Sequence, residues 1–338
     1  MATMKDVARE AGVSLGTVSN VLNGHASVQE KNREKVWEAV RKLGFRSNMA
    51  ARTLRTNSSR NLGLVIPDIQ NPYYPELARG VEDAAREAGF TVFLCNDDRD
   101  SKKEEDYLEA LVGKSVDGII LVKPQVSEEL LERMSIHTRF VLVDSGEIRK
   151  SNYHVVNVDD AAGIKEGMEY LYTLGHRKIG FIRGMLESYS SKIRANAYVN
   201  FLNEKELPLS YGLIQRGDYT WSSGYTAAKE MIRMPEPPTA ILASNDVMAI
   251  GCMKAIQDSG LRIPEDISVM GYDNVDVCNL CTPSLTTIHQ PKYEVGHESL
   301  RMLAACMCED VGVWKDRPEQ LILKPRLIER RSVGPALS

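Results

Sequence analysis

The sequence has no long apolar run and none of the motifs that mark common enzyme classes. Its longest apolar stretches, such as residues 118–122, are far shorter than the about 20 residues that cross a bilayer. It lacks Gly-x-Gly-x-x-Gly after a first strand, His-Glu-x-x-His and Gly-x-Ser-x-Gly. Residues 113–115 resemble the tail of a phosphate-binding loop, but Leu108 stands where that loop needs its first glycine. We therefore expect neither a membrane protein nor an enzyme.

Cysteine is also scarce, with six in 338 residues. This number, and an N-terminus without an apolar signal core, lead us to expect a cytoplasmic protein. The pairs Cys278/Cys281 and Cys306/Cys308 lack the four spaced ligands of a zinc site. They also lack the strand-to-helix setting of a redox motif. We expect free, partly buried thiols, structural histidines, no metal and no cofactor.

The N-terminal segment, in contrast, is rich in helix signals. Thr3 can cap a helix whose third position is Asp6, and Gly12 supplies the positive φ that ends it. Ser14 can cap a second helix, whose buried stripe has spacings of three and four residues: Val18, Val21 and Leu22. A third helix is expected from Ser27 to Gly44. Three helices with such a short turn predict an all-α helix-turn-helix unit.

Charge supports this interpretation. The first sixty residues contain eleven Lys and Arg against five Asp and Glu, whereas the whole chain has a net charge of −4. The N-terminal segment is thus about +6 and the remainder about −10, which favours contact of the first segment with a polyanion such as DNA. A basic bundle that is merely well solvated is the alternative. Capping, turn and charge together favour the DNA-reading unit.

Beyond residue 60, short apolar runs alternate with amphipathic stretches. Candidate strands are 62–67, 91–96, 118–122, 140–144, 178–183, 240–244 and 267–271. Candidate helices are 74–88, 102–112, 161–174, 190–204, 222–234 and 247–259. Several strands are almost continuous Ile, Val and Leu, as in a parallel sheet covered on both faces. Because the series restarts near residue 160, we expect an α/β core of two Rossmann-like lobes with a ligand cleft at the carboxyl ends of their strands.

Residues 47–60 join the two parts. They open with helix formers and close in a polar Asn-Ser-Ser stretch. Alone, this segment is too short to hold a helix in water. A bare linker is one interpretation, and a segment that orders only on DNA is the other.

Over essentially its whole length the chain resembles the LacI/GalR family of bacterial transcription regulators. The resemblance is carried by the signature in residues 4–23 and by 51–54 (Ala-Arg-Thr-Leu), 63–68 (Gly-Leu-Val-Ile-Pro-Asp), 71–74 (Asn-Pro-Tyr-Tyr), 116–120 (Val-Asp-Gly-Ile-Ile), 175–180 (Gly-His-Arg-Lys-Ile-Gly), 245–249 (Asn-Asp-Val-Met-Ala), 271–274 (Gly-Tyr-Asp-Asn) and 285–291 (Leu-Thr-Thr-Ile-His-Gln-Pro). Residues 325–332 are similar to the purine repressor branch. The family implies a homodimer on near-palindromic operator DNA.

The resemblance also implies a domain plan. It comprises a DNA-binding headpiece (1–46), a hinge helix or linker (47–60) and an effector-binding and dimerisation core (61–338) like the periplasmic sugar-binding proteins. The N-lobe is expected over about 61–160 plus part of 291–325. The C-lobe is expected over about 161–290 plus the C-terminal end. No heptad repeat precedes Ser338, which favours a dimer over a tetramer.

In the family, three positions of the second helix face the base edges. Here they are Leu15, Gly16 and Asn20. Leu15 offers only apolar contact, for instance to a thymine methyl, whereas Asn20 can pair bidentately with adenine. Gly16 has no side chain that could contact a base edge, so these positions do not determine the operator sequence.

Other positions are expected to hold the DNA backbone or to deform the DNA. Ser14, Thr17 and Asn48 suit phosphate contacts, and Thr17 and Ser19 could equally serve the helix alone. Leu54 matches the hinge leucine that family members wedge into the minor groove, although alone it could be a buried linker residue.

The resemblance also implies an effector site. The matching positions are Tyr73, Tyr74, Ser188, Ser190, Arg194, Tyr219, Asn245, Asp273 and Gln290, with Asp144 and Ser145 as weaker matches. Arg194 and Asp273 suit neighbouring hydroxyls, or they could form a salt bridge between the lobes. Tyr219, with Trp221 nearby, could stack on a sugar face or a heterocycle.

Two departures bear on the ligand. Ser188 replaces an arginine of the purine repressor, and Ser145 replaces its tryptophan. A sugar or sugar derivative is therefore favoured over a nucleoside or purine, while an atypical or absent effector stays open. We expect a ligand-controlled repressor of a carbohydrate-utilisation operon. A solute-binding receptor is the alternative, which the attached DNA module disfavours. Both directions of the effector's action stay open: it either releases the DNA or is needed to hold it. The sequence does not identify the regulated genes.

Overall fold

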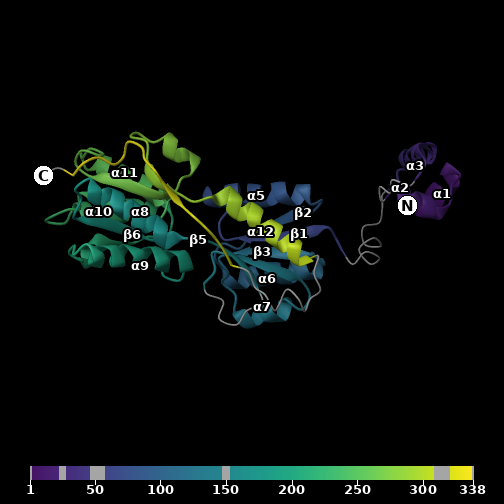
Figure 1. The fold of residues 1–338 in the computed structure, drawn as a ribbon, viewed down its shortest axis with the longest axis horizontal. Helices are drawn as coiled ribbons and strands as arrows, with labels where there is room; N and C mark the ends of the chain where they lie inside the picture. The colour runs from purple at the N-terminus through teal and green to yellow at the C-terminus, as the bar shows by residue number, and fades with distance from the viewer. Residues whose placement is uncertain (1, 23–27, 46–57, 147–152, 308–319, 337–338) are drawn as a thin grey trace. The chain divides into compact units, whose positions relative to one another are not determined.

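The chain divides into the units Met1–Ser59 and Arg60–Ser338, which are described separately. The computed structural model describes residues 2–22, 28–45, 58–146, 153–307 and 320–336 (Figure 1). The predicted hinge over 47–60 lies outside these residues except for its last three. Among the described residues, no helix is both long and apolar enough to cross a bilayer.

The described residues of the first unit form three helices. They are α1 (Met4–Ala11), α2 (Leu15–Leu22) and α3 (Glu30–Leu43). The predicted caps are present: the Asp6 amide donates to Thr3 Oγ1, and the Asp6 carboxylate accepts from the Thr3 amide. Gly12 ends α1 with a φ of 63°, and Ser14 Oγ accepts from the Thr17 amide at 3.0 Å.

The predicted start of the third helix at Ser27 is wrong. The helix begins at Glu30, and its N-cap Gln29 has an extended ψ of 136° and no side-chain capping bond. Val28 packs against the core of this unit, so packing rather than a serine cap sets where the chain enters the helix. Ser27 itself lies outside the described residues. The core is formed by Val7, Ala11, Val18, Val21, Val36 and Ala39.

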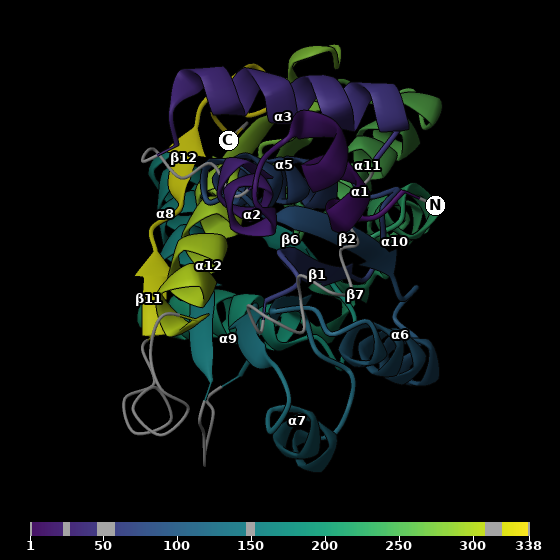
Figure 2. The same cartoon turned by 90° about the vertical axis from the view of Figure 1, so that its right-hand side faces the viewer.

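The N-lobe is a six-stranded parallel sheet in the order β11-β5-β4-β3-β1-β2. Its strands are β1 (Asn61–Ile66), β2 (Thr91–Asn96), β3 (Gly118–Val122), β4 (Arg139–Val143), β5 (His154–Val158) and β11 (Gln320–Leu323). The helices among its described residues are α5 (Tyr73–Glu87), α6 (Ser101–Gly113), α7 (Glu128–Met134) and α12 (Lys292–Met307). Helices α5 and α12 cover one face of the sheet, and α6 and α7 cover the other (Figure 2).

The central strand β3 shows why these strands are apolar throughout. Ile120 and Val122 pack into the core beneath α5 and α12, whereas Ile119 and Leu121 pack into the core beneath α6 and α7. Successive side chains of a strand point to opposite faces, so a sheet covered on both faces needs no polar alternation.

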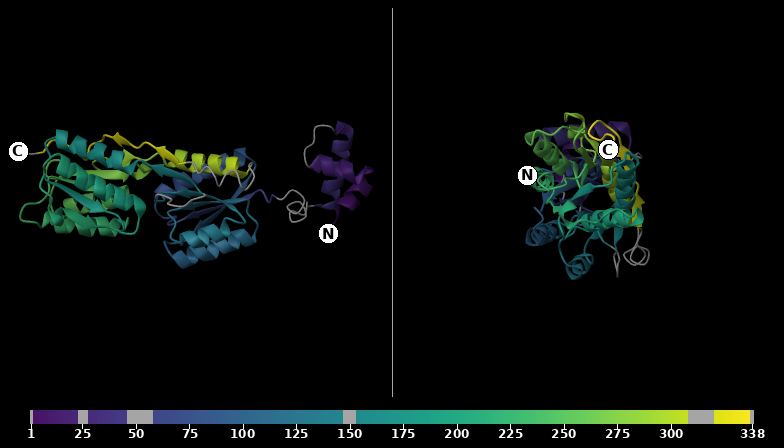
Figure 3. Two further views of the ribbon diagram at one scale, coloured as in Figure 1. Left: turned by 60° about the horizontal axis from the view of Figure 1, so that its bottom comes forward. Right: turned by 90° about the vertical axis from the view of Figure 1, so that its left-hand side faces the viewer.

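The C-lobe repeats this plan with the order β12-β10-β9-β8-β6-β7, in which only the edge pair β10–β12 is antiparallel. Figure 3 shows the ribbon of both lobes from two further sides. Its strands are β6 (Ile179–Arg183), β7 (Ile214–Arg216), β8 (Ala240–Ala243), β9 (Ser268–Asp273), β10 (Thr286–His289) and β12 (Arg326–Ile328). Its longer helices are α8 (Asp160–Thr173), α9 (Tyr189–Glu204), α10 (Trp221–Ile232) and α11 (Asp246–Asp258). Helices α8 and α9 share one core, and α10 and α11 share the other.

The predicted two-lobed α/β fold is confirmed, and the chain passes between the lobes more than once. After β10 in the C-lobe it enters α12 of the N-lobe, and it later returns from β11 to β12. The structure also contains elements that the sequence pattern did not predict: strands β5, β7, β10, β11 and β12, and helices α7 and α12. Most of these strands are short and lie toward the sheet edges, where their pairing depends on partners distant in sequence.

Helices α5 and α12 approach closely through glycine. A Cβ atom added to Gly80 would lie 2.0 Å from the Tyr293 carbonyl oxygen, and one on Gly296 would lie 2.0 Å from the Leu77 carbonyl oxygen. Because no side chain fits at either point, glycine permits direct backbone contact between the two helices.

Candidate functional site

The exposed face of α2 carries the predicted base-reading residues. Leu15, Gly16 and Asn20 are exposed, whereas Val18 and Val21 are buried in the headpiece core. Leu15 is 44% exposed. The helix therefore presents an apolar and an amide side chain outward, as contact with base edges requires.

The remaining predicted DNA contacts stay predictions, and the structure places some of these residues. Ser14 Oγ lies 2.9 Å from Thr17 Oγ1 and also accepts from the Thr17 amide, so both side chains serve the start of α2. Ser19 is half-buried on the same helix. Asn48 and Leu54 lie outside the described residues.

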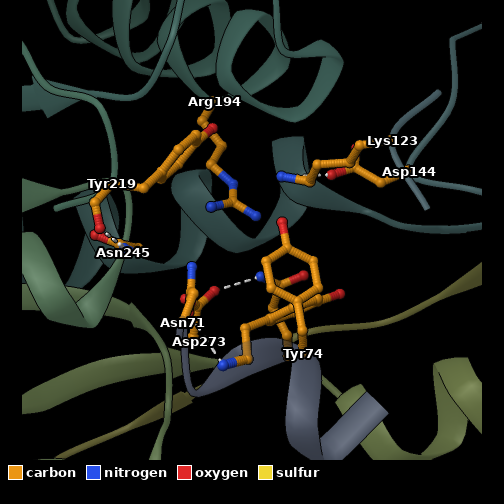
Figure 4. A pocket seen from close by; sticks show the side chains of 10 residues that line it. Asn71, Tyr74, Lys123, Asp144, Arg194, Tyr219, Asn245 and Asp273 are labelled. Carbon is orange, nitrogen blue, oxygen red and sulfur yellow. Dashed lines mark hydrogen bonds and ion pairs between the residues drawn. The ribbon is translucent and has the colours of Figure 1, made fainter. Parts of the chain in front are cut away.

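The core unit contains a pocket with an empty volume of about 290 Å³ between the lobes. Its lining comes from both sheets: Asn71, Tyr73, Tyr74, Lys123, Asp144, Arg194, Tyr219, Asn245, Asp273 and Gln290 (Figure 4). Lys123 and Asp144 follow β3 and β4, Asn245 follows β8, and Asp273 ends β9. The lining thus gathers at the carboxyl ends of parallel strands, where ligands of such sheets bind.

A lysine that the sequence analysis missed spans the pocket. Lys123 Nζ lies 2.9 Å from Asp144 Oδ2 in the N-lobe and donates to Ser190 Oγ in the C-lobe at 3.2 Å. It also lies 5.0 Å from the ring centroid of Tyr219. Burial lowers the pKa of Lys123, but attraction to Asp144 outweighs it and holds the pKa well above its ordinary value. The available signal was its position directly after an apolar strand.

Among the residues that the structure describes, the partners of Arg194 lie in the C-lobe. Its Nε donates to Asp160 Oδ1 at 2.9 Å, its Nη1 donates to the Ser244 carbonyl oxygen, and its guanidinium lies 3.8 Å from the ring centroid of Tyr272. Asp160 Oδ1 also accepts from the Tyr272 hydroxyl at 2.7 Å. The alternative of an inter-lobe salt bridge between Arg194 and Asp273 is wrong, because the carboxylate that pairs with Arg194 is that of Asp160.

The floor of the pocket is a polar network. Asn245 Oδ1 caps α11 by accepting from the Met248 amide, while its Nδ2 donates to the Tyr219 carbonyl oxygen. Gln290 Nε2 donates to Asp273 Oδ1 at 2.6 Å, and burial raises the pKa of Asp273 to about 7. This carboxyl can therefore accept or donate a hydrogen bond to a ligand hydroxyl near neutral pH.

Backbone conformation is unusual at the same place. Lys123, Asp144, Tyr219 and Asp273 all have positive φ, at 56°, 52°, 72° and 120°. Non-glycine residues in this region are strained, and such strain concentrates at ligand sites. The surrounding packing holds four pocket side chains in directions that a relaxed backbone would not give them.

A second cluster of buried carboxyls supports the loop after Lys123. Both carboxylate oxygens of Glu104 accept from the Gln125 amide at 3.1 Å, and one also accepts from the Val126 amide. Asp97 lies beside Glu104; burial raises the pKa of Asp97 to about 6 and that of Glu104 to about 7. The sequence analysis did not single out either residue.

Comparison with known proteins decides the family. The description "Bacterial regulatory proteins, lacI family" matches residues 3–48, and "Periplasmic binding protein-like domain" matches residues 168–333. The HTH-type transcriptional repressor PurR of Aliivibrio salmonicida is 36% identical over 305 residues, which make up 90% of this chain and 91% of PurR. The chain belongs to the LacI family.

Solved structures agree with the LacI family assignment. The transcriptional regulator CelR–cellobiose complex is 28% identical, with a TM-score of 0.73, and the match covers 98% of this chain and 100% of CelR. The lac repressor dimer bound to operator and the anti-inducer ONPF is 26% identical, with a TM-score of 0.86. The match covers 98% of this chain and 99% of the lac repressor chain. This LacI family chain is a DNA-binding transcriptional regulator, and the relatives named here are regulators rather than enzymes, as expected.

Most of the predicted effector residues lie together in this regulator. Tyr73, Tyr74, Asp144, Arg194, Tyr219, Asn245, Asp273 and Gln290 line the pocket. Ser188 and Ser190 lie just behind the lining, since Ser188 Oγ accepts from the Tyr219 hydroxyl and Ser190 from Lys123. Trp221 is not among the lining residues; it is 43% exposed and stacks on Tyr225. Asn71, Lys123 and Asp160 are the residues that sequence reasoning missed.

Proposed function

We propose that this chain is a transcriptional repressor whose operator affinity is set by a sugar or sugar derivative bound between the lobes of the core. The observation that carries the proposal is the pocket lining, in which side chains from both sheets offer amides, carboxyls, a guanidinium and aromatic rings. Such a mixture suits a ligand with many hydroxyl groups and apolar ring faces. The cellobiose complex of the similar regulator CelR adds support.

Two observations bear on the class of the effector. The similarity to PurR keeps a purine or nucleoside as the second candidate. Ser188 and Ser145, which differ from the purine repressor, favour the sugar.

We further propose a homodimer on a near-palindromic operator. The similar lac repressor was solved as a dimer on operator.

In this proposal the effector contacts both lobes and biases their relative rotation. That rotation governs whether the two hinge segments, residues 48–56, can pair and enter the minor groove. A coupling of about 1–3 kcal/mol would change operator affinity by roughly 5–150-fold. The proposal includes both directions of this change: the effector either lowers operator affinity and releases the DNA, or raises it and is needed to hold the DNA.

A gel-shift assay with genomic fragments and random competitor DNA tests the proposal. We expect preference for a fragment, and a change in that affinity on adding a sugar. Response to hypoxanthine or guanine alone would replace the sugar by the second candidate. Sugar binding without preference for any fragment would favour a solute receptor and overturn the repressor.

Leu54→Ala tests the hinge contact. Loss of an apolar wedge should lower operator affinity at least tenfold, which corresponds to about 1.4 kcal/mol. Leu209→Ala, at an exposed leucine of the C-lobe, is the matched control and should leave operator affinity unchanged. Effector binding, measured by calorimetry, should be the same in both variants. Unchanged operator affinity of Leu54→Ala would remove the wedge.

A further inference from the structure

Each cation of the effector pocket already has a carboxylate partner. Lys123 pairs with Asp144 at 2.9 Å, and Arg194 pairs with Asp160 at 2.9 Å. All four side chains are at least four-fifths buried, so water screens these pairs little. The positive charges that would ordinarily attract an anionic ligand are thus neutralised within the protein.

The pocket has a further carboxyl without a cation of its own. Among the described residues Asp273 forms no ion pair; its side chain accepts from the amide of Gln290. The nearby ammonium of Lys292 donates to the Asp273 backbone carbonyl and pairs with Glu76 at 3.2 Å. Carboxyl groups therefore outnumber the cations around the site.

We propose that this pocket selects an uncharged polyhydroxyl effector and rejects the phosphorylated form of the same compound. The inference rests on the proposed function, in which the effector binds here. A phosphate group needs a cation that is free to pair with it. To release Lys123 the ligand would have to separate it from Asp144, and would leave that carboxylate buried without a partner.

Neutral hydroxyl groups meet no such penalty. An ammonium has three hydrogens, and Asp144 and Ser190 accept two of those of Lys123, which leaves one for a ligand oxygen. Carboxylates accept hydrogen bonds from hydroxyls while keeping their own ion pairs. The side chains that repel a phosphate are thus the ones that bind a sugar, and the Lys123–Asp144 pair determines the specificity.

The first experiment is calorimetry on the full-length chain. The probes are D-glucose, D-ribose and cellobiose, with glucose 6-phosphate, ribose 5-phosphate and inorganic phosphate. We expect a neutral sugar to bind at least tenfold more tightly than its phosphorylated form. Tighter binding of a phosphorylated sugar would overturn this inference but leave the proposed sugar-responsive function intact. Binding of hypoxanthine or guanine, with no sugar of either kind, would overturn the proposed function and the inference with it.

The second experiment does not depend on which sugar is the effector. Asp144→Asn keeps the side-chain shape and releases the Lys123 ammonium, so inorganic phosphate should bind at least tenfold more tightly than to the unmodified chain. Asp106→Asn, at an exposed carboxylate of α6, removes the same charge outside the pocket and is the matched control. Phosphate binding that stays equal in all three proteins, with native circular dichroism, would overturn the inference. Equal gains in both variants would do the same, because total charge rather than Lys123 would then govern binding.

Discussion

Arg194→Met should destabilise the core far more than its single ion pair suggests. Arg194 is only 3% exposed, and its guanidinium contacts Asp160, the Ser244 carbonyl oxygen and the ring of Tyr272. Methionine keeps most of the side-chain length but removes the charge and the donors. The carboxylate of Asp160 would remain buried, with the Tyr272 hydroxyl as its remaining side-chain donor.

The magnitude follows from the geometry. At 2.9 Å and an effective dielectric constant near 20, Coulomb attraction between Arg194 and Asp160 is about 6 kcal/mol. Desolvation offsets part of this attraction, and removal of one partner from a buried pair costs about 3–5 kcal/mol. Each kcal/mol lowers the thermal midpoint of a domain of this size by about 2–4 °C. We therefore expect the midpoint to fall by roughly 6–20 °C.

A second substitution separates charge from packing. The double variant Arg194→Met/Asp160→Asn has neither charge of the buried pair. Its free energy of unfolding should therefore be about 1–3 kcal/mol higher than the sum of the losses in the two single variants predicts. Urea unfolding followed by circular dichroism measures all four proteins. Additive costs within about 0.5 kcal/mol would refute the claim that the ion pair holds Arg194 in place. Calorimetry should show sugar binding weakened in both variants that lack Arg194, even where stability recovers.

Two further predictions concern pH and helix packing. Burial raises the pKa of Glu104 to about 7 and that of Asp97 to about 6. In the unfolded chain both pKa values are about 4. The stability that these two acids contribute is therefore fully present below about pH 4 and is lost as the pH rises toward 7. Glu104→Gln should therefore lose less stability than the unmodified chain between pH 5 and pH 8 in urea unfolding; equal losses would contradict this reasoning. Gly80→Ala would place a Cβ 2.0 Å from the Tyr293 carbonyl oxygen, and separating α5 from α12 should cost about 1–3 kcal/mol. Gly113→Ala is the control, because a Cβ atom there would have no neighbour within 4 Å. Equal thermal midpoints for the two variants would show that α5 and α12 can move apart without a loss of stability.

The sequence alone determined the features that depend on neighbours within a few residues. The Thr3–Asp6 capping box joins two residues three positions apart, and Gly12 ends the same helix with a left-handed backbone. Both signals can be recognised in the sequence because they do not depend on the rest of the fold. The alternation of apolar strands with amphipathic helices likewise predicted two α/β lobes, because a doubly covered sheet imposes its pattern on each segment separately. The resemblance to LacI family proteins supplied most of the pocket residues.

Only the tertiary structure decided which of these residues act as partners. Lys123 meets Asp144 and Ser190, and Arg194 meets Asp160 rather than Asp273, because separate strands end at the same edge of their sheets. No local pattern encodes such pairings, because strands distant in sequence bring these charges together, and a charge buried there is costly unless it is paired. The same holds for α12, whose place in the N-lobe depends on backbone contact with α5 across more than two hundred residues. Local sequence thus indicated most of the longer helices and strands, whereas long-range packing determined the edge strands and the charge pairs that shape the pocket.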